Sequence, residues 1–134
     1  MPAVLNGSLN VVEWLGLRLE LPRPWEIVRH GVSSRKGSLA FADRRRQRLQ
    51  VTWTSCVKRP DVGRLLSDHR ARQQVIDTDA VFATPTLPPG WRGLERRFGP
   101  ALDADRSEAA TLVRAAHYHA ETARLIEVVV DVDP

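Results

Sequence analysis

Residues 124–132, "RLIEVVVDV", limit most strongly what this chain can fold into. Three consecutive valines and an isoleucine are β-branched, and such residues favour strands. The preceding residues 109–120 are rich in alanine and are compatible with a helix or a strand. The segment "AETA" between them has the length of a hairpin connection, so we expect 109–120 to pair as a strand with 124–132.

A second hairpin is predicted in residues 38–53, "SLAFADRRRQRLQVTW". Apolar residues alternate with polar ones, and those that share one face are Leu39, Phe41, Leu49, Val51 and Trp53. Asp43 suits the start of a turn, and a connection of this length is common in hairpins. The arginines of this connection, Arg44–Arg46, are therefore expected at a solvated tip, with Arg48 on the outward face of the next strand.

Two further strands are expected before this hairpin and one after it. Residues 15–22, "LGLRLELP", alternate leucines with Gly, Arg and Glu, which predicts a strand with one buried face. A short strand follows at 25–32, and the polar residues 31–37 predict a connection. After the proline-rich loop 83–90, "ATPTLPPG", residues 91–98 carry a moderate strand pattern.

The one predicted helix covers residues 61–74, where the apolar period changes. The residues that recur at helical spacing are Val62, Leu65, Leu66 and His69. Asp61 stands where its carboxylate can accept hydrogen bonds from the first turn. Arginines gather toward the C-terminal end, where positive charge interacts favourably with the helix dipole.

These elements predict an α+β fold, a mostly antiparallel sheet of about six to seven strands with one main helix packed on it. The chain has the size of one domain, so we expect a single domain over residues 1–134. Hydrophobic residues make up 43% of the chain, an ordinary share for a globular protein. Cys56 is the sole cysteine, which excludes an internal disulfide and suits a reducing compartment.

The order of these elements resembles the PsbP-like, or DcrB-like, family. The residues that carry the resemblance are "LRLELPRPWEIV", the hairpin at 38–53, the helix after it and the final pair "HYHAETARLIEVVVDV". The resemblance implies a PsbP-like sheet with a binding or assembly role, because members of the family are mostly binding and assembly proteins, chaperones among them, rather than enzymes.

One part of the sequence departs from the family pattern. Members usually continue past the last strand into a C-terminal helix that covers the sheet, whereas "VVDVDP" closes this sequence. An uncovered apolar sheet face is a liability for a soluble monomer. We therefore expect an N-terminal element, a second copy of the chain or a dedicated partner to cover that face.

Charge is unevenly distributed along the chain. Residues 29–72 hold 12 Lys/Arg against 3 Asp/Glu, a net charge of +9, whereas residues 103–134 hold 3 against 7, a net charge of −4. Such asymmetry attracts an anionic partner or pairs the two halves of the chain. The basic residues of the predicted partner-binding surface are Arg35, Lys36, Arg44, Arg45, Arg46 and Arg48.

We predict a non-catalytic protein-binding, adaptor or chaperone-like domain that presents a sheet face and the basic hairpin to an acidic protein partner. Guanidinium groups also match phosphates, so the alternative is a nucleic-acid-associated accessory protein that uses the same arginines. The aromatic residues fall within strand patterns and no helix-turn-helix is visible, which favours the protein partner. For the arginine cluster taken by itself, a solvated hairpin tip is the first interpretation and a docking patch is the second.

A second alternative is a metal-binding or enzymatic domain built on His117 and His119. The two histidines alternate in "AHYHA" and so point to the same face of a strand. A zinc site needs three or four ligands, and no motif supplies the others. Cys56, His69 or Glu121 would have to complete the site through folding.

Other candidates for chemistry have plainer interpretations. Cys56 lies beside Lys58 and Arg59, which favour a thiolate, but no nucleophile motif surrounds it. His69 fits the boundary of the apolar helix stripe. The acidic residues with the closest spacing lack the pattern of a calcium loop and are expected to solvate a turn: Asp103, Asp105 and Glu108. The prediction therefore includes no catalytic residue and no cofactor.

Two features bear on location. Residues 1–22 lack the basic and apolar regions of a signal peptide. No stretch reaches the roughly 18 apolar residues of a membrane span. A cytoplasmic location is therefore expected.

Overall fold

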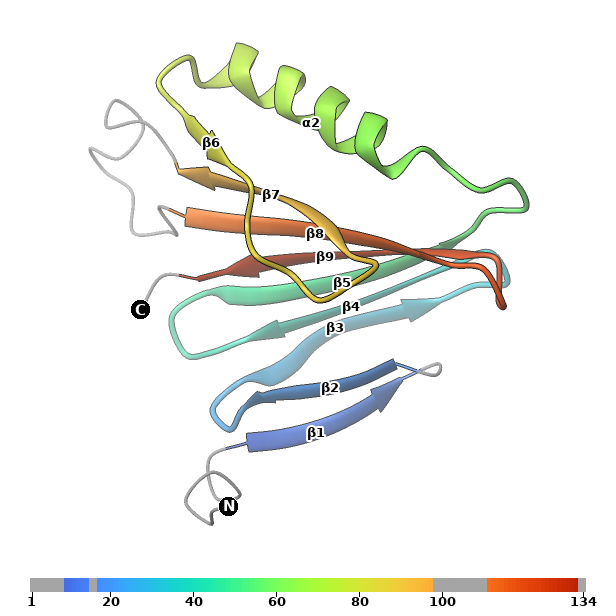
Figure 1. Ribbon diagram of the computed structural model, residues 1–134. Helices are drawn as coiled ribbons and strands as arrows, with labels where there is room; N and C mark the ends of the chain where they lie inside the picture. The colour runs from blue at the N-terminus through green and yellow to red at the C-terminus, as the bar shows by residue number, and fades with distance from the viewer. Residues whose placement is uncertain (1–8, 15–16, 98–110, 133–134) are drawn as a thin grey trace.

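The computed structural model describes residues 9–14, 17–97 and 111–132. Figure 1 shows a broad sheet with one long helix beside it. The elements follow the chain in the order β1 (Leu9–Trp14), β2 (Leu17–Pro22), β3 (Glu26–Val32), β4 (Lys36–Ala42), β5 (Gln47–Ser55), α2 (Val62–Ile76), β6 (Val81–Ala83), β7 (Arg92–Arg97), β8 (Thr111–His119) and β9 (Arg124–Asp131). The predicted α+β class is confirmed.

The described strands form a seven-stranded sheet and a separate two-stranded sheet. The larger sheet has the order β3-β4-β5-β9-β8-β7-β6, and every neighbouring pair is antiparallel. The predicted hairpins are confirmed as β4–β5 and β8–β9. The central neighbours β5 and β9 are far apart in the sequence, so their pairing joins the two halves of the chain (Figure 1).

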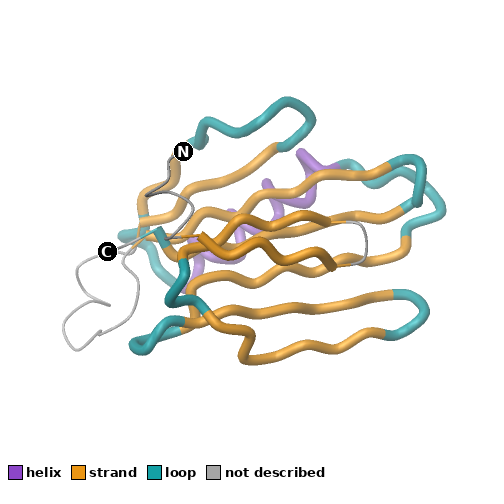
Figure 2. Tube along the Cα trace, turned by 90° about the horizontal axis from the view of Figure 1, so that it is seen from below, coloured by secondary structure: helices purple, strands orange, loops and turns teal. Residues whose placement is uncertain are grey.

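The core lies between the two sheets. Its buried cluster comprises Leu21, Leu39, Phe41, Leu49, Val51, Trp53 and Ile126. Val12 of β1 and Leu19 of β2 pack against this cluster, so the β1–β2 hairpin covers the apolar face of the larger sheet. Figure 2 shows this hairpin in front of the larger sheet and the helix behind it. An N-terminal element therefore covers the apolar face, which was one of the expected arrangements.

Several strands differ from the sequence prediction. The sequence pattern did not indicate β1 or β6, and both are short strands defined by their pairing with β2 and β7. β3 and β4 extend into the predicted 31–37 connection, which leaves a shorter turn. The N–H of Ser33 donates to the carbonyl oxygen of Lys36 at 2.8 Å and closes that turn.

The helix begins as predicted and ends later. The Asp61 side chain accepts a hydrogen bond from the N–H of Arg64 at 3.0 Å, which confirms the expected cap. α2 continues to Ile76, so its last turn contains no basic residue. The prediction that arginines gather at the C-terminal end is therefore wrong, because the helix runs past them.

α2 lies on the face of the sheet opposite the core, against β7 and β8. The Arg96 side chain of β7 donates to Oε1 of Gln73 and lies 4.0 Å from a carboxylate oxygen of Asp77. No residue of α2 is buried, and Leu65 of the predicted apolar stripe is 42% exposed. In the described part of the chain, no helix is long and apolar enough to cross a membrane.

The face opposite the core carries mainly polar and small side chains over β4, β5 and β9. Ser38, Thr52 and Glu127 are consecutive cross-strand neighbours on this face. In the next row, Ala40 pairs with Gln50, which pairs with Val129. This face therefore needs no apolar cover of the kind that the core face requires.

Gly37 is a position where a side chain would collide with the core. A Cβ at Gly37 would lie 2.4 Å from Nε1 of Trp53, whose side chain is buried. We expect Gly37→Ala to lower the free energy of unfolding by about 1–3 kcal/mol, because the indole ring has to shift. Urea denaturation measures this loss. Gly31→Ala is the matched control, since a Cβ there meets no heavy atom within 4 Å; equal losses would contradict the packing.

Candidate functional site

Asp43 organises the β4–β5 turn that carries the arginines. Its Oδ1 accepts hydrogen bonds from the backbone N–H groups of Arg45 at 2.7 Å and Arg46 at 3.0 Å. These two backbone hydrogen bonds, together with the Arg48 guanidinium, lower the pKa of Asp43 to about 2. The predicted turn at Asp43 is confirmed.

Two arginines of the cluster belong to an ion-pair network with Asp43 and Asp131. The Arg48 side chain is 6% exposed, and its Nε donates to Oδ2 of Asp43 at 2.7 Å. Its Nη1 lies 3.4 Å from Oδ1 of Asp131. Arg46 donates to the same Asp131 carboxylate through Nε and, at 3.3 Å, through Nη2. The prediction that Arg46 lies at a solvated tip is therefore wrong, and Arg48, which was expected on the outward face of its strand, is buried in ion pairs.

The sheet pairing explains this burial. The β4–β5 register shifts between Phe41↔Leu49 and Ala42↔Gln47, which makes Arg48 the extra residue of a bulge. Asp131, at the end of β9, is itself buried and requires cationic partners. A carboxylate from the last strand thus neutralises side chains that local alternation assigns to solvent.

The remaining basic residues of the predicted surface lie in two places. Arg44 and Arg45 are exposed at the β4–β5 turn. Arg35 and Lys36 are exposed at the opposite end of β4, roughly 20 Å away by the rise of a seven-residue strand. The structure therefore does not unite the predicted residues in one patch.

Between these two basic ends runs β3, a margin of the seven-stranded sheet (Figure 1). All seven residues of β3 are exposed, and within the described part of the chain it pairs with β4 alone. Its apolar side chains Ile27, Val28 and Val32 are 51%, 58% and 56% exposed. An open strand edge with apolar side chains is a template for pairing with another chain.

A hollow lies at each end of β3. One, of about 600 Å³, is lined by Pro24, Glu26, Val28, Ala42, Asp43, Arg44 and Arg45. The other, of about 520 Å³, is lined by Gly31, Val32, Ser33, Lys36, Gly37, Ser38, Thr52, Trp53 and Thr54. Each hollow combines an exposed valine of β3 with at least one basic residue.

The histidine pair of β8 is held by local contacts. Nδ1 of His117 lies 2.7 Å from the carbonyl oxygen of Gly90, and its ring stacks on Trp91. Nδ1 of His119 lies 2.8 Å from Oγ1 of Thr122. The two imidazole centroids are 6.4 Å apart. Among the described residues, no group of three His, Cys, Asp or Glu side chains could hold a metal ion.

The other candidates for chemistry have structural partners. The Tyr118 hydroxyl donates to the carbonyl oxygen of Cys56 at 2.8 Å, and the Cys56 N–H donates to the Ala123 carbonyl oxygen. His69 lies on the sheet side of α2. Partial burial lowers its pKa to about 4, and the positive charges of Arg114, Arg72 and Arg96 add to this effect. The acidic residues Asp103, Asp105 and Glu108 lie outside the described residues.

Sequence reasoning missed two features of this region. It gave Asp131 no role, although the end of a β-branched strand is an unusual place for a buried carboxylate. It also treated β3 as an ordinary strand, because its position at the sheet margin depends on the strand order. Comparisons with family models, with curated proteins and with solved structures find no match for this chain.

The Asp131 network predicts a large effect on stability. We expect Asp131→Asn to lower the free energy of unfolding by about 3 kcal/mol, because it leaves Arg48 buried with too little negative charge. Glu13→Gln is the matched control, since the Arg18–Glu13 pair at 3.8 Å is exposed and contributes little. Urea denaturation compares the two variants, and a loss in Asp131→Asn no larger than in Glu13→Gln would contradict the network.

His69 predicts a pH dependence of stability. Its pKa in the folded chain lies below the unfolded value of 6.5, so the unfolded chain takes up a proton first as the pH falls. The stabilisation that comes from keeping His69 neutral in the folded chain is complete above about pH 6.5 and declines as the pH falls toward 4. We expect His69→Gln to reduce the drop in the thermal midpoint between pH 7 and pH 5. His30→Gln, on exposed β3, is the control; an unchanged drop in His69→Gln would refute the assignment.

Proposed function

We propose that this chain is a non-catalytic, cytoplasmic protein-binding domain that holds an extended segment of an acidic partner along the outer edge of β3. The observation that carries the proposal is the exposure of every residue of β3, whose pairing in the described part of the chain is limited to β4. A segment that adds to a sheet edge gains main-chain hydrogen bonds along its length. Its alternate side chains then provide specificity.

The charges at the two ends of β3 define the partner. Arg44 and Arg45 adjoin Val28 in one hollow, which Glu26 and Asp43 also line, and Asp43 is already paired with Arg48. Lys36 adjoins Val32 in the other hollow. A segment with acidic residues near its ends and apolar residues between them matches both hollows. Charges at the rim of an interface contribute chiefly to the rate and specificity of association.

The bulge in β3 supports a recognition role. The β3–β4 register shifts between Ile27 and Arg29, so Val28 is the extra residue of this strand. Bulges occur often beside binding sites, where they redirect a side chain. Here the bulged residue Val28 lines the hollow beside the basic turn.

The PsbP-like resemblance supports the same class of function. The family consists mostly of binding and assembly proteins, and we include a PsbP-like architecture in the proposal. The resemblance is an analogy of fold, so the residues of β3 carry more of the argument than the family does.

The ion pairs reduce the support for the nucleic-acid alternative. Arg46 and Arg48 are neutralised by Asp43 and Asp131, which leaves two exposed arginines at the turn. Affinity for nucleic acid increases with the number of cations that contact phosphates. A protein segment that also uses the apolar side chains of β3 is the better match.

Peptide selection tests the proposal. Random peptides displayed on phage and selected on the purified chain are expected to carry apolar residues flanked by Asp or Glu. The double variant Val28→Lys/Val32→Lys should weaken the binding of a selected peptide by about ten-fold or more, because lysines on a strand edge oppose strand addition. Fluorescence anisotropy measures this dissociation constant. Arg44→Glu/Arg45→Glu should weaken the acidic peptides as well.

Val75→Lys is the matched control, because Val75 is 81% exposed on α2. Selected peptides that bind the double lysine variant as tightly as the parent chain would overturn the proposal. A dimer in analytical ultracentrifugation that the double lysine variant dissociates would also overturn it. In that case a second copy of the chain, and not an acidic partner, occupies the edge.

A further inference from the structure

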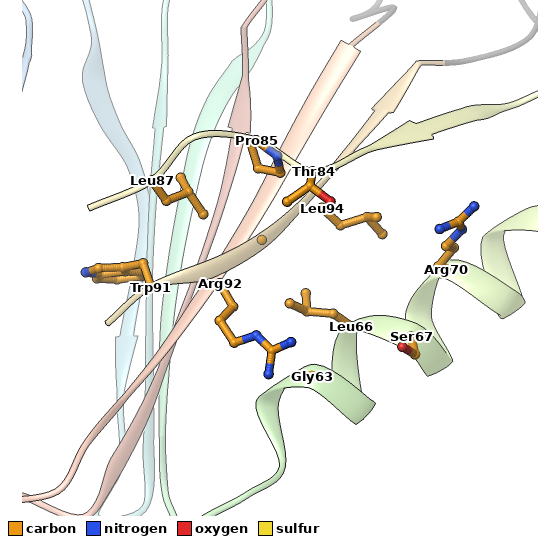
Figure 3. Close-up of a pocket in the computed structure, with 11 residues that line it drawn as sticks. Gly63, Leu66, Ser67, Arg70, Thr84, Pro85, Leu87, Trp91, Arg92 and Leu94 are labelled. Atoms are coloured by element: carbon orange, nitrogen blue, oxygen red, sulfur yellow. The ribbon is translucent and has the colours of Figure 1, made fainter. Parts of the chain in front are cut away.

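A hollow of about 360 Å³ lies beside the first turns of α2, near the edge of the sheet opposite to β3. Figure 3 shows the apolar side chains Leu66, Leu87, Leu94 and Trp91 around it. Its volume is near the lower end of the roughly 300–1,000 Å³ found for sites of small molecules. The hollow is therefore large enough for a small organic ligand.

The short strand β6 creates this hollow. β6 pairs with β7 only from Val81↔Arg97 to Ala83↔Glu95, which leaves Gly93 beyond its end. The following loop folds back onto Gly93, where a Cβ would lie 2.6 Å from Cδ1 of Leu87. The loop, the edge of β7 and α2 thus form three walls.

Arg92 reaches from β7 to the first turn of α2. A Cβ at Gly63 would lie 2.6 Å from Nη1 of Arg92, so the guanidinium rests where Gly63 has no side chain (Figure 3). In the described part of the chain, no carboxylate forms an ion pair with Arg92. The positive charge at this end of the hollow therefore has no counter-charge among the described residues.

Arg70 of α2 lies at the other end of the hollow. Its Cζ is 5.2 Å from the centre of the Phe82 ring, which is a cation–π contact. Leu66 and Leu94 lie between Arg70 and Arg92 (Figure 3). The hollow therefore places two leucine side chains between two cations.

We infer that this hollow binds a small organic anion, a carboxylate or a phosphate monoester with a short apolar chain. The acidic group contacts the guanidinium of Arg92, whose planar fork matches both anions. The apolar chain lies on Leu66 and Leu94 and extends toward Arg70. This inference is independent of the proposed role of β3, because no residue is shared between the two surfaces.

Titration with defined probes, followed by amide and indole NMR signals of the ¹⁵N-labelled chain, tests the inference. Octanoate and octyl phosphate distinguish the two acidic groups, and 1-octanol is the neutral probe. At least one anion should shift the signals of Trp91 and Gly93 saturably, with a millimolar or lower dissociation constant. The stronger of the two anions identifies the acidic group.

Three variants assign the contact to Arg92. Arg92→Gln should raise the dissociation constant of the tighter-binding anion by about ten-fold or more, since it removes a charge-assisted hydrogen bond. Gly63→Ala should also weaken binding, because the new methyl group displaces the guanidinium while the charge stays the same. Alanine is a better helix residue than glycine, so this variant should fold. Arg64→Gln is the matched control, since the Arg64 side chain is 79% exposed on the same helix.

Three results would overturn the inference. The first is that neither anion produces a saturable shift. The second is that 1-octanol binds as tightly as the anions, which would leave the guanidinium without a role. The third is that Arg64→Gln weakens binding as much as Arg92→Gln does, which would indicate general attraction to a basic surface.

Discussion

The pairing of β5 with β9 holds the two halves of the sheet together. Its ladder runs from Leu49↔Val130 to Ser55↔Arg124 and places Val51 opposite Val128. Because side chains alternate, a slip of one residue would turn the core residues of β5 toward the open face. The Arg48–Asp131 ion pair lies at the end of the same ladder and opposes such a slip, since two buried charges would lose their partners.

The features predicted from the sequence depend on nearby residues. The alternation of apolar and polar residues on both sides of Asp43 predicted the β4–β5 hairpin, and the β-branched residues 124–132 predicted the β8–β9 hairpin. Asp61 marked the start of α2 because a cap acts within one turn. In each case the decisive interaction spans only a few positions, so the sequence contains the whole signal.

The features that were missed depend on residues far apart in the chain. The burial of Arg48 is decided by Asp131, and the exposure of β3 is decided by its place at the sheet margin. The three-residue β6 is a strand only because β7 lies beside it. The contact of Arg92 with Gly63 joins a strand to a helix. A local pattern carries no information on any of these contacts.

The helix α2 has few buried contacts with the sheet, so its opening and the unfolding of the core differ in free-energy cost. No residue of the helix is buried, and its side-chain contacts with Arg96 come from Gln73 and Asp77, near its C-terminal end. Segments with few buried contacts open at a lower free-energy cost than the core does. Opening of the helix is therefore expected to cost less free energy than opening of the β5–β9 ladder, and it would remove one wall of the hollow beside β7. A ligand in that hollow would contact α2 and β7 together and would oppose the opening of the helix.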